Sequence, residues 1–221
     1  MGPIRAHFAT LPPSERFNLW THAGGALAAL VGGAFLVARA TSPLAVVAFG
    51  VYGLSLVLLY AASATHHALP PAPGRKERLR RLDHISIYAL IMGTYAPPCL
   101  LLLPPSVGWP LLGVVWLLGA GGIVLKATTS FAPRWITVTL YIALGWSAVF
   151  AARPIVQLGT SNALYLLGGG GLVYTLGAIV YATKKPDLWP RYVGFHGLWH
   201  VLVLVASALQ FAFVALYVPT G

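Results

Sequence analysis

The chain is poor in charged residues, and in acidic residues above all. Of its 221 residues only 8% are charged and only four are Asp or Glu, whereas 58% are hydrophobic. Soluble globular domains carry about 25% charged residues, so the composition excludes an ordinary soluble domain. It predicts an integral membrane protein in which few carboxylates are available for any chemistry.

Cysteine is almost missing as well. Cys99 is the only one in the sequence, which excludes an intramolecular disulfide framework and a cysteine-rich metal site. Any transition metal would have to be held by His, Asp, Glu or water. The first twenty residues also lack the compact apolar core of a cleavable signal peptide, so we expect the first apolar segment to direct insertion and to remain.

Apolar segments, by contrast, are abundant. Seven of them approach the roughly 20 residues that a spanning helix needs, and the loops between them carry prolines, which cannot continue a helix. The sequence predicts an all-α integral membrane protein: one domain of seven transmembrane helices over residues 1–221, with residues 1–20 as a cytoplasmic N-terminal segment. Pro97 and Pro98 fall inside the third span and should kink it. The predicted spans run from about Thr21 to Val37, Pro43 to His67, Asp83 to Leu103, Trp109 to Leu125, Trp135 to Ala152, Ala163 to Thr183 and His196 to Val218.

Basic residues are divided unevenly between the two sides of the predicted bundle. The net charge is +10, and all Lys and Arg except Arg39 and Arg153 lie in the N-terminal segment or the loops after the second, fourth and sixth spans. The positive-inside rule places the N-terminus in the cytoplasm and the C-terminus outside. Loops that face anionic lipid explain the charge better than nucleic-acid binding does. We therefore expect a multi-pass protein of the cell inner (plasma) membrane with no nucleic-acid partner.

Two glycine-rich stretches lie inside predicted spans, Gly119–Gly122 in the fourth and Gly168–Gly171 in the sixth. Small residues let transmembrane helices approach closely, so close packing is the favoured interpretation of both. A hinge or a substrate path remains the alternative. The sequence does not indicate an oligomeric state.

A histidine pair opens the last predicted span. His196 and His200 are four residues apart, so both rings lie on one face of a helix, one turn from each other. Two imidazoles so placed can hold one metal ion. Ionisable side chains inside a membrane are costly and therefore mark functional sites, although hydrogen-bonded packing would also explain the pair.

The predicted orientation brings three more polar residues to the same end of the bundle. Ser63 and His67, again four residues apart, end the second span, and Asp83 lies on the first turn of the third. With the histidine pair they make three imidazoles, one carboxylate and one hydroxyl at similar depth. Catalytic zinc takes three protein ligands and leaves a position for water, a carboxylate accepts the proton of that water, and a hydroxyl orients the water or an oxyanion.

Other interpretations of these residues stay open. Ser63 by itself is typical of a packing serine, and Asp83 could be a first-turn charge or a partner of Arg80 or Arg81. His66 and His84 flank the candidates and are expected to support the site or to lie at the interface.

The start of the first helix carries its own polar residues. Glu15, Asn18 and His22 are spaced to form a polar stripe that could support the site. Alternatively, Glu15 simply interacts with the N-terminal helix dipole.

Three motifs resemble the signatures of the progestin and adipoQ receptor family, whose bacterial branch is called haemolysin III. They are Ser63-x-x-x-His67, Asp83 within RLDHISIYALIMGTYAP, and His196-x-x-x-His200; ERFNLWTHAGG resembles the family's N-terminal motif. The resemblance runs from Glu15 to the last helix. It implies a seven-helix fold with zinc (Zn2+) near the cytoplasmic face, held by His67, His196 and His200, with Asp83 and Ser63 near its water.

The resemblance also implies a function. The related alkaline ceramidases hydrolyse lipid amides, and the implied role of the bacterial branch is membrane lipid homeostasis. Our first hypothesis is a zinc-dependent hydrolase of lipid amide (ceramide-like) or acyl bonds, with a membrane lipid or fatty acyl ligand. The alternatives are a non-catalytic sensor or regulator with structural zinc, and a pore-forming cytolytic protein.

Overall fold

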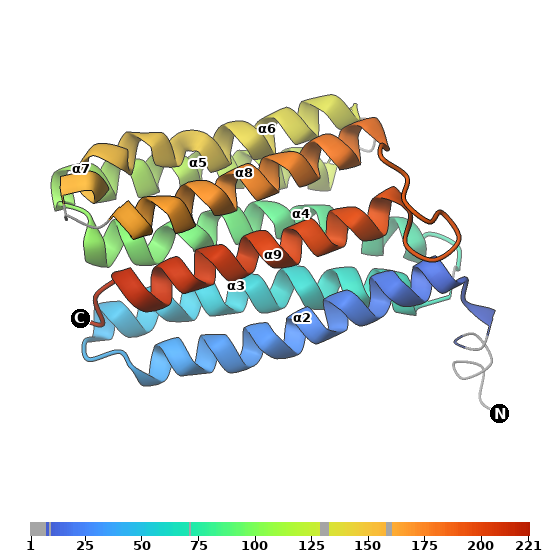
Figure 1. The fold of residues 1–221 in the computed structure, drawn as a ribbon, viewed down its shortest axis with the longest axis horizontal. Helices are drawn as coiled ribbons and strands as arrows, with labels where there is room; N and C mark the ends of the chain where they lie inside the picture. The colour runs from blue at the N-terminus through green and yellow to red at the C-terminus, as the bar shows by residue number, and fades with distance from the viewer. Residues whose placement is uncertain (1–7, 9, 71, 129–132, 158–160) are drawn as a thin grey trace.

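A computed structural model describes residue 8 and residues 10–70, 72–128, 133–157 and 161–221. All regular structure in these ranges is helical. Seven helices among the described residues are long and apolar enough to cross a membrane, as the sequence predicts. They lie side by side in one bundle, in which the first helix starts at the end opposite to the chain's C-terminus (Figure 1).

Two of the seven spans are interrupted. A π-helix, η1 (Pro98–Leu102), follows α4 at the Pro97–Pro98 pair, and a 3₁₀-helix, η2 (Ser147–Ala151), with α7 (Ala152–Gln157), extends α6. A change to π geometry is expected where proline removes a backbone donor from the helix ladder. The spanning helices are α2 (Pro13–Ala38), α3 (Pro43–Ala68), α4 (Arg75–Pro97), α5 (Pro105–Thr128), α6 (Arg134–Trp146), α8 (Ser161–Thr183) and α9 (Gly194–Tyr217).

The first and third spans begin earlier than predicted. α2 starts at Pro13 and α4 at Arg75, eight residues before the expected starts at Thr21 and Asp83. Hydropathy marks only the part of a helix that lies in lipid, whereas the helix itself continues through the polar interface. The placement of Asp83 on the first turn is therefore wrong: Asp83 lies in the third turn of α4, too far from the helix start to be a first-turn charge.

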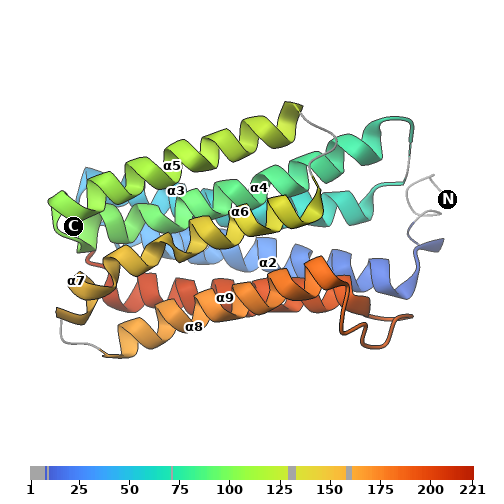
Figure 2. The same ribbon diagram turned by 90° about the horizontal axis from the view of Figure 1, so that it is seen from above.

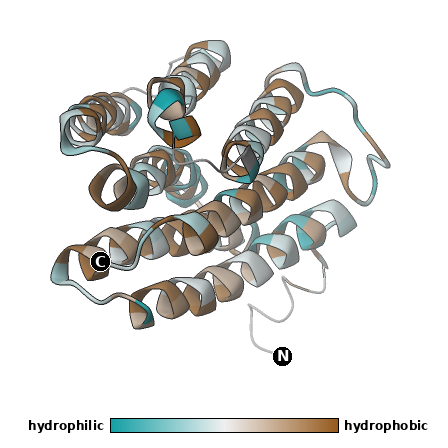
Figure 3. Cartoon of the chain, turned by 60° about the vertical axis from the view of Figure 1, so that its left-hand side comes forward, coloured by the Kyte–Doolittle hydropathy of each residue, from teal (hydrophilic) through white to brown (hydrophobic). Residues whose placement is uncertain are grey.

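α3 and α4 form the inner part of the bundle. Half of the apolar window of each is buried, against 22–39% for the other five. α3 packs against α2 and α4, and α9 packs against α8 and α2; Figure 2 shows the same arrangement from above. The helices are largely hydrophobic along their length (Figure 3), and leucines such as Leu54 and Leu117 are exposed, as expected for helices that face lipid.

The two glycine-rich stretches have different surroundings. Gly119 and Gly122 of α5 pack directly against Met92 and Tyr88 of α4, which confirms close packing there. Gly168 and Gly171 of α8 instead line an internal cavity.

The orientation in the membrane remains a prediction that cysteine labelling tests. Leu188, in the loop before α9, and Pro219, after α9, are both exposed and flank opposite ends of the last span. We expect Pro219→Cys to react with a membrane-impermeant maleimide on intact cells, and Leu188→Cys to react only after lysis. Wild type is the control, because Cys99 is buried. Labelling of Leu188→Cys on intact cells would reverse the assignment.

Candidate metal centre

Three imidazoles meet where α3 ends and α9 begins, at the right-hand end of the bundle in Figure 1. His67, His196 and His200 each offer one ring nitrogen, and these nitrogens all lie within 4.8 Å of one another. His67 and His200 are 4% and 1% exposed, and His196 is half-buried. The structure therefore brings the two predicted histidine motifs together into a cluster that could hold a metal ion.

The spacing of the His67 and His196 rings fits tetrahedral coordination. Nε2 of His67 lies 3.3 Å from Nε2 of His196. Two imidazole nitrogens bound at 2.0–2.1 Å in a tetrahedral site are separated by about 3.3 Å. Nδ1 of His200 is buried and has no hydrogen-bond partner among the described residues, an arrangement that is costly unless a ligand satisfies the ring. The residues present thus fit a metal with nitrogen ligands.

Glu15 of α2 holds His67 in place. Its Oε2 lies 2.7 Å from Nδ1 of His67. With Nδ1 donating to the carboxylate, Nε2 keeps its lone pair and faces the cluster. Metal-binding histidines typically donate their second ring N–H to such a carboxylate. Glu15 also lies in the first turn of α2, so it contacts the site in addition to occupying the favourable end of the helix dipole.

The rest of the polar stripe on α2 is buried beside the cluster. His22 stacks on His200, with ring centroids 3.6 Å apart and planes 10° from parallel. Asn18 and His22 are each 3% exposed. Gly197 of α9 allows this approach, because a Cβ at that position would lie 3.1 Å from Oδ1 of Asn18. The stripe therefore packs behind His200 and restricts the orientation of its ring.

Ser63 and Asp83 lie on the wall of a cavity of about 480 Å³ that His196 and His200 also line. The Asp83 carboxylate is close enough to interact with the Ser63 hydroxyl and the His67 ring. All five residues singled out from the sequence are thus brought to one place. Their roles as ligands and catalytic groups stay predictions.

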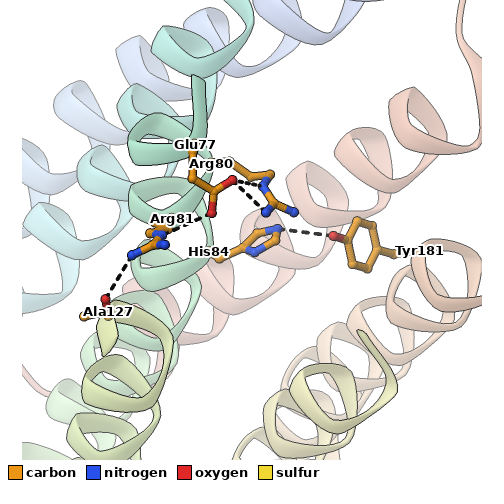
Figure 4. A network of polar contacts seen from close by, with 6 residues as sticks. All are labelled: Glu77, Arg80, Arg81, His84, Ala127 and Tyr181. Carbon is orange, nitrogen blue, oxygen red and sulfur yellow. Dashed lines mark hydrogen bonds and ion pairs between the residues drawn. The ribbon is translucent and has the colours of Figure 1, made fainter. Parts of the chain in front are cut away.

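Arg80 and Arg81, considered as partners of Asp83, bind another carboxylate. Nη2 of Arg80 lies 2.7 Å from Glu77 Oε2, and Nε of Arg81 lies 3.1 Å from Glu77 Oε1. Figure 4 shows the carboxylate of Glu77 between the two guanidinium groups. Asp83 is left to face the cavity.

His84 has a larger part than the sequence indicated. It lines the cavity, and its Nε2 lies 3.2 Å from the hydroxyl of Tyr181 on α8 (Figure 4). No sequence pattern indicates a role for Tyr181, since pairing across helices depends on how each helix is rotated. His66, in contrast, lies beside His67 with centroids 5.1 Å apart and is not one of the three clustered rings.

The cavity continues from the cluster into the bundle. Its lining includes Asp83 and His196 at one end and Leu103, Leu111 and Ile155 toward the other. Most of the inner wall is aliphatic or aromatic. The arrangement places histidines that could hold a metal ion at the end of an apolar chamber of the size that binds small molecules.

Comparisons with known proteins agree with these features. Residues 12–211 match the family model described as Haemolysin-III related. The chain is 37% identical to "Hemolysin-3" of Bacillus cereus, over 94% of this chain and 93% of that protein. It is 34% identical to "Hemolysin-3 homolog" of Bacillus subtilis (strain 168), with 92% and 93% covered. Human "Monocyte to macrophage differentiation factor" is 25% identical over 88% of this chain and 80% of its own. No solved structure matches.

The arrangement around His67 predicts how metal affinity depends on Glu15. Loss of a carboxylate that orients a histidine ligand typically costs 10–100-fold in metal affinity. We expect Glu15→Gln to weaken metal binding by about that factor and His67→Ala to abolish it, as measured by competition with a chromogenic chelator. Glu77→Gln is the control, because Glu77 lies on α4 and its carboxylate binds Arg80 and Arg81 instead of a histidine. Unchanged affinity in Glu15→Gln would show that Glu15 does not support a metal ligand.

Proposed function

The chain belongs to the Haemolysin-III related family of multi-pass membrane proteins, and from that premise we propose that it is a zinc-dependent hydrolase of lipid amide or acyl bonds. The observation that carries the proposal is the three-imidazole cluster with a carboxylate beside it at the end of an apolar cavity. A site built only to join helices has no need of the cavity or of a carboxylate that faces it.

Zinc fits the donor set. Imidazole nitrogens suit several transition metals, but three protein ligands with a fourth position left for water are typical of catalytic zinc. His67, His196 and His200 would hold the ion. When bound, zinc supplies a Lewis acid that polarises a carbonyl and lowers the pKa of water toward about 7.

The protein's own residues supply the remaining chemistry. Asp83 would accept the proton of the attacking water and return it to the leaving group, as general acid–base catalysis requires. The Ser63 hydroxyl, close to Asp83, would orient the water or donate to the developing oxyanion. The apolar wall beyond them would hold the acyl chain and exclude bulk water from the reaction.

The ligand is proposed to be a membrane lipid or a fatty acyl chain. Its scissile bond would lie at Asp83, near the end of the bundle, and its chain would extend inward past Tyr95 toward Leu103. A lipid substrate agrees with a multi-pass protein of the plasma membrane, because its substrate then reaches the site from the surrounding bilayer.

Regulation without catalysis is the second candidate. The cluster and Glu15 connect α2, α3 and α9, so a structural zinc would also stabilise the bundle. Cytolysis is the third, and it rests on the name of the Bacillus cereus relative. Removal of zinc that lowers the thermal stability of wild type, without any lipid product from zinc-loaded protein, would favour the regulator.

Asp83→Asn tests catalysis directly. Because a general base contributes about 10²–10⁴-fold, we expect turnover to fall at least a hundredfold while zinc content stays at the wild-type level. The measurement combines metal analysis with mass spectrometry of a lipid extract incubated with purified protein.

Asp187→Asn is the matched control, because Asp187 accepts from Phe195 N in the loop before α9 and does not line the cavity. Wild-type turnover in Asp83→Asn would contradict the proposal. Loss of zinc together with activity would make Asp83 a metal ligand and not the base.

A further inference from the structure

One face of α4 continues the cavity wall beyond the metal centre, toward the end of the bundle. Arg80, Asp83, His84 and Ile87 all line the cavity, at the i, i+3, i+4, i+7 spacing of a single helix face. With a rise of 1.5 Å per residue, Arg80 lies about 4.5 Å nearer to the end of the bundle than Asp83. The Arg80 guanidinium therefore lies at the mouth of the cavity, about one helical turn outside Asp83.

Glu77 orients this cation. Both Nε and Nη2 of Arg80 bond to the same oxygen, Glu77 Oε2, at 3.1 and 2.7 Å. These two bonds leave Nη1 of the guanidinium for a further acceptor. Figure 4 shows the guanidinium beside the His84 ring, on the side of α4 that faces Tyr181. The Arg80 side chain is 52% exposed, so a ligand can reach it.

A second cation comes from another helix. Lys126 of α5 lines the same cavity and lies close enough to interact with the charges of Arg80, Arg81 and Glu77. None of the hydrogen bonds or ion pairs found among the described residues involves the Lys126 ammonium. The Glu77 carboxylate thus bonds to Arg80 and Arg81, while Lys126 lies near these charges without a bonded carboxylate among the described residues. Like charges at such distances repel, and an anion between Arg80 and Lys126 would offset that repulsion.

We propose that Arg80 and Lys126 form a binding site for the anionic group of a membrane amphiphile, a phosphate, sulfate or carboxylate carried beside an acyl chain. The anionic group binds at the mouth, the adjoining bond lies at Asp83, and the chain occupies the apolar interior. The claim that such an amphiphile is the substrate rests on the proposed hydrolase function. The claim that Arg80 and Lys126 bind an anionic group does not depend on that function.

The site differs from the general basic surface of the same end. Arg78 is also on α4 and exposed, but it does not line the cavity. A headgroup that merely rests on the membrane surface would interact with Arg78 as well as with Arg80. Arg78→Gln is therefore the matched control for charge on this helix.

Binding of radiolabelled dodecyl phosphate to the purified full chain in a neutral detergent tests the proposal. Charge-assisted hydrogen bonds are among the strong ones, so Arg80→Gln and Lys126→Gln should each weaken binding at least about tenfold. Arg78→Gln should change it less than twofold. In wild type, dodecanol and inorganic phosphate should each bind at least tenfold more weakly than dodecyl phosphate.

Several results would overturn the proposal. Equal weakening by Arg78→Gln would reduce the site to surface charge, and phosphate as tight as dodecyl phosphate would make the ligand a free anion. A measurement on wild type keeps the test valid if the variants fail to fold. Raising salt from about 0.1 to 1 M shortens the electrostatic screening length, so it should weaken the binding of dodecyl phosphate but not that of dodecanol. Binding that ignores salt would contradict an anion site.

Failure of this proposal and failure of the hydrolase are distinguishable. If dodecyl phosphate binding depends on Arg80 and Lys126 while wild type releases no lipid product, the anion site stands and hydrolysis falls. If wild type hydrolyses neutral and anionic lipids equally, and dodecyl phosphate binding ignores both substitutions, hydrolysis stands and the anion site falls.

Discussion

The contact between His67 and His196 joins two residues that lie 129 positions apart, inside a bundle whose outer surface is largely hydrophobic. Buried imidazoles are costly in such a place unless each nitrogen has a partner. The surrounding structure supports two of the rings: Glu15 binds Nδ1 of His67, and His22 stacks on His200, whose Nδ1 has no hydrogen-bond partner among the described residues. The contacts of these histidine rings therefore connect α2, α3 and α9 at this end of the bundle.

The residues that line the cavity change in character from the end of the bundle inward. From the end of the bundle inward it presents Arg80 and Lys126, then Asp83 with the histidines, and then an aliphatic wall that reaches Leu103. Two cations, a carboxylate beside histidines and apolar volume follow one another in the order in which an amphiphile carries its headgroup, its linking bond and its chain. Gly168 and Gly171 of α8 line the same cavity, where the lack of a side chain leaves more room.

Helix number and the convergent site were predictable from the sequence, because seven apolar segments are long enough to span and the i, i+4 pairs fix which residues share a face. The early starts of α2 and α4 were not, because hydropathy does not report a helix that continues through the polar interface. The sequence indicates the polar stripe on α2, but it does not indicate that Glu15 pairs with His67. Such contacts, like that of His84 with Tyr181, depend on helix rotation, which the spacing of residues within one helix does not determine.

We propose that three imidazoles and a water hold one zinc. X-ray absorption at the zinc edge of the purified full chain tests it most directly, because the method reports ligand type and distance without any substrate. We expect three nitrogen ligands at about 2.0–2.1 Å and one oxygen ligand, with no sulfur. Sulfur scattering, or a metal coordinated only by oxygen, would contradict it.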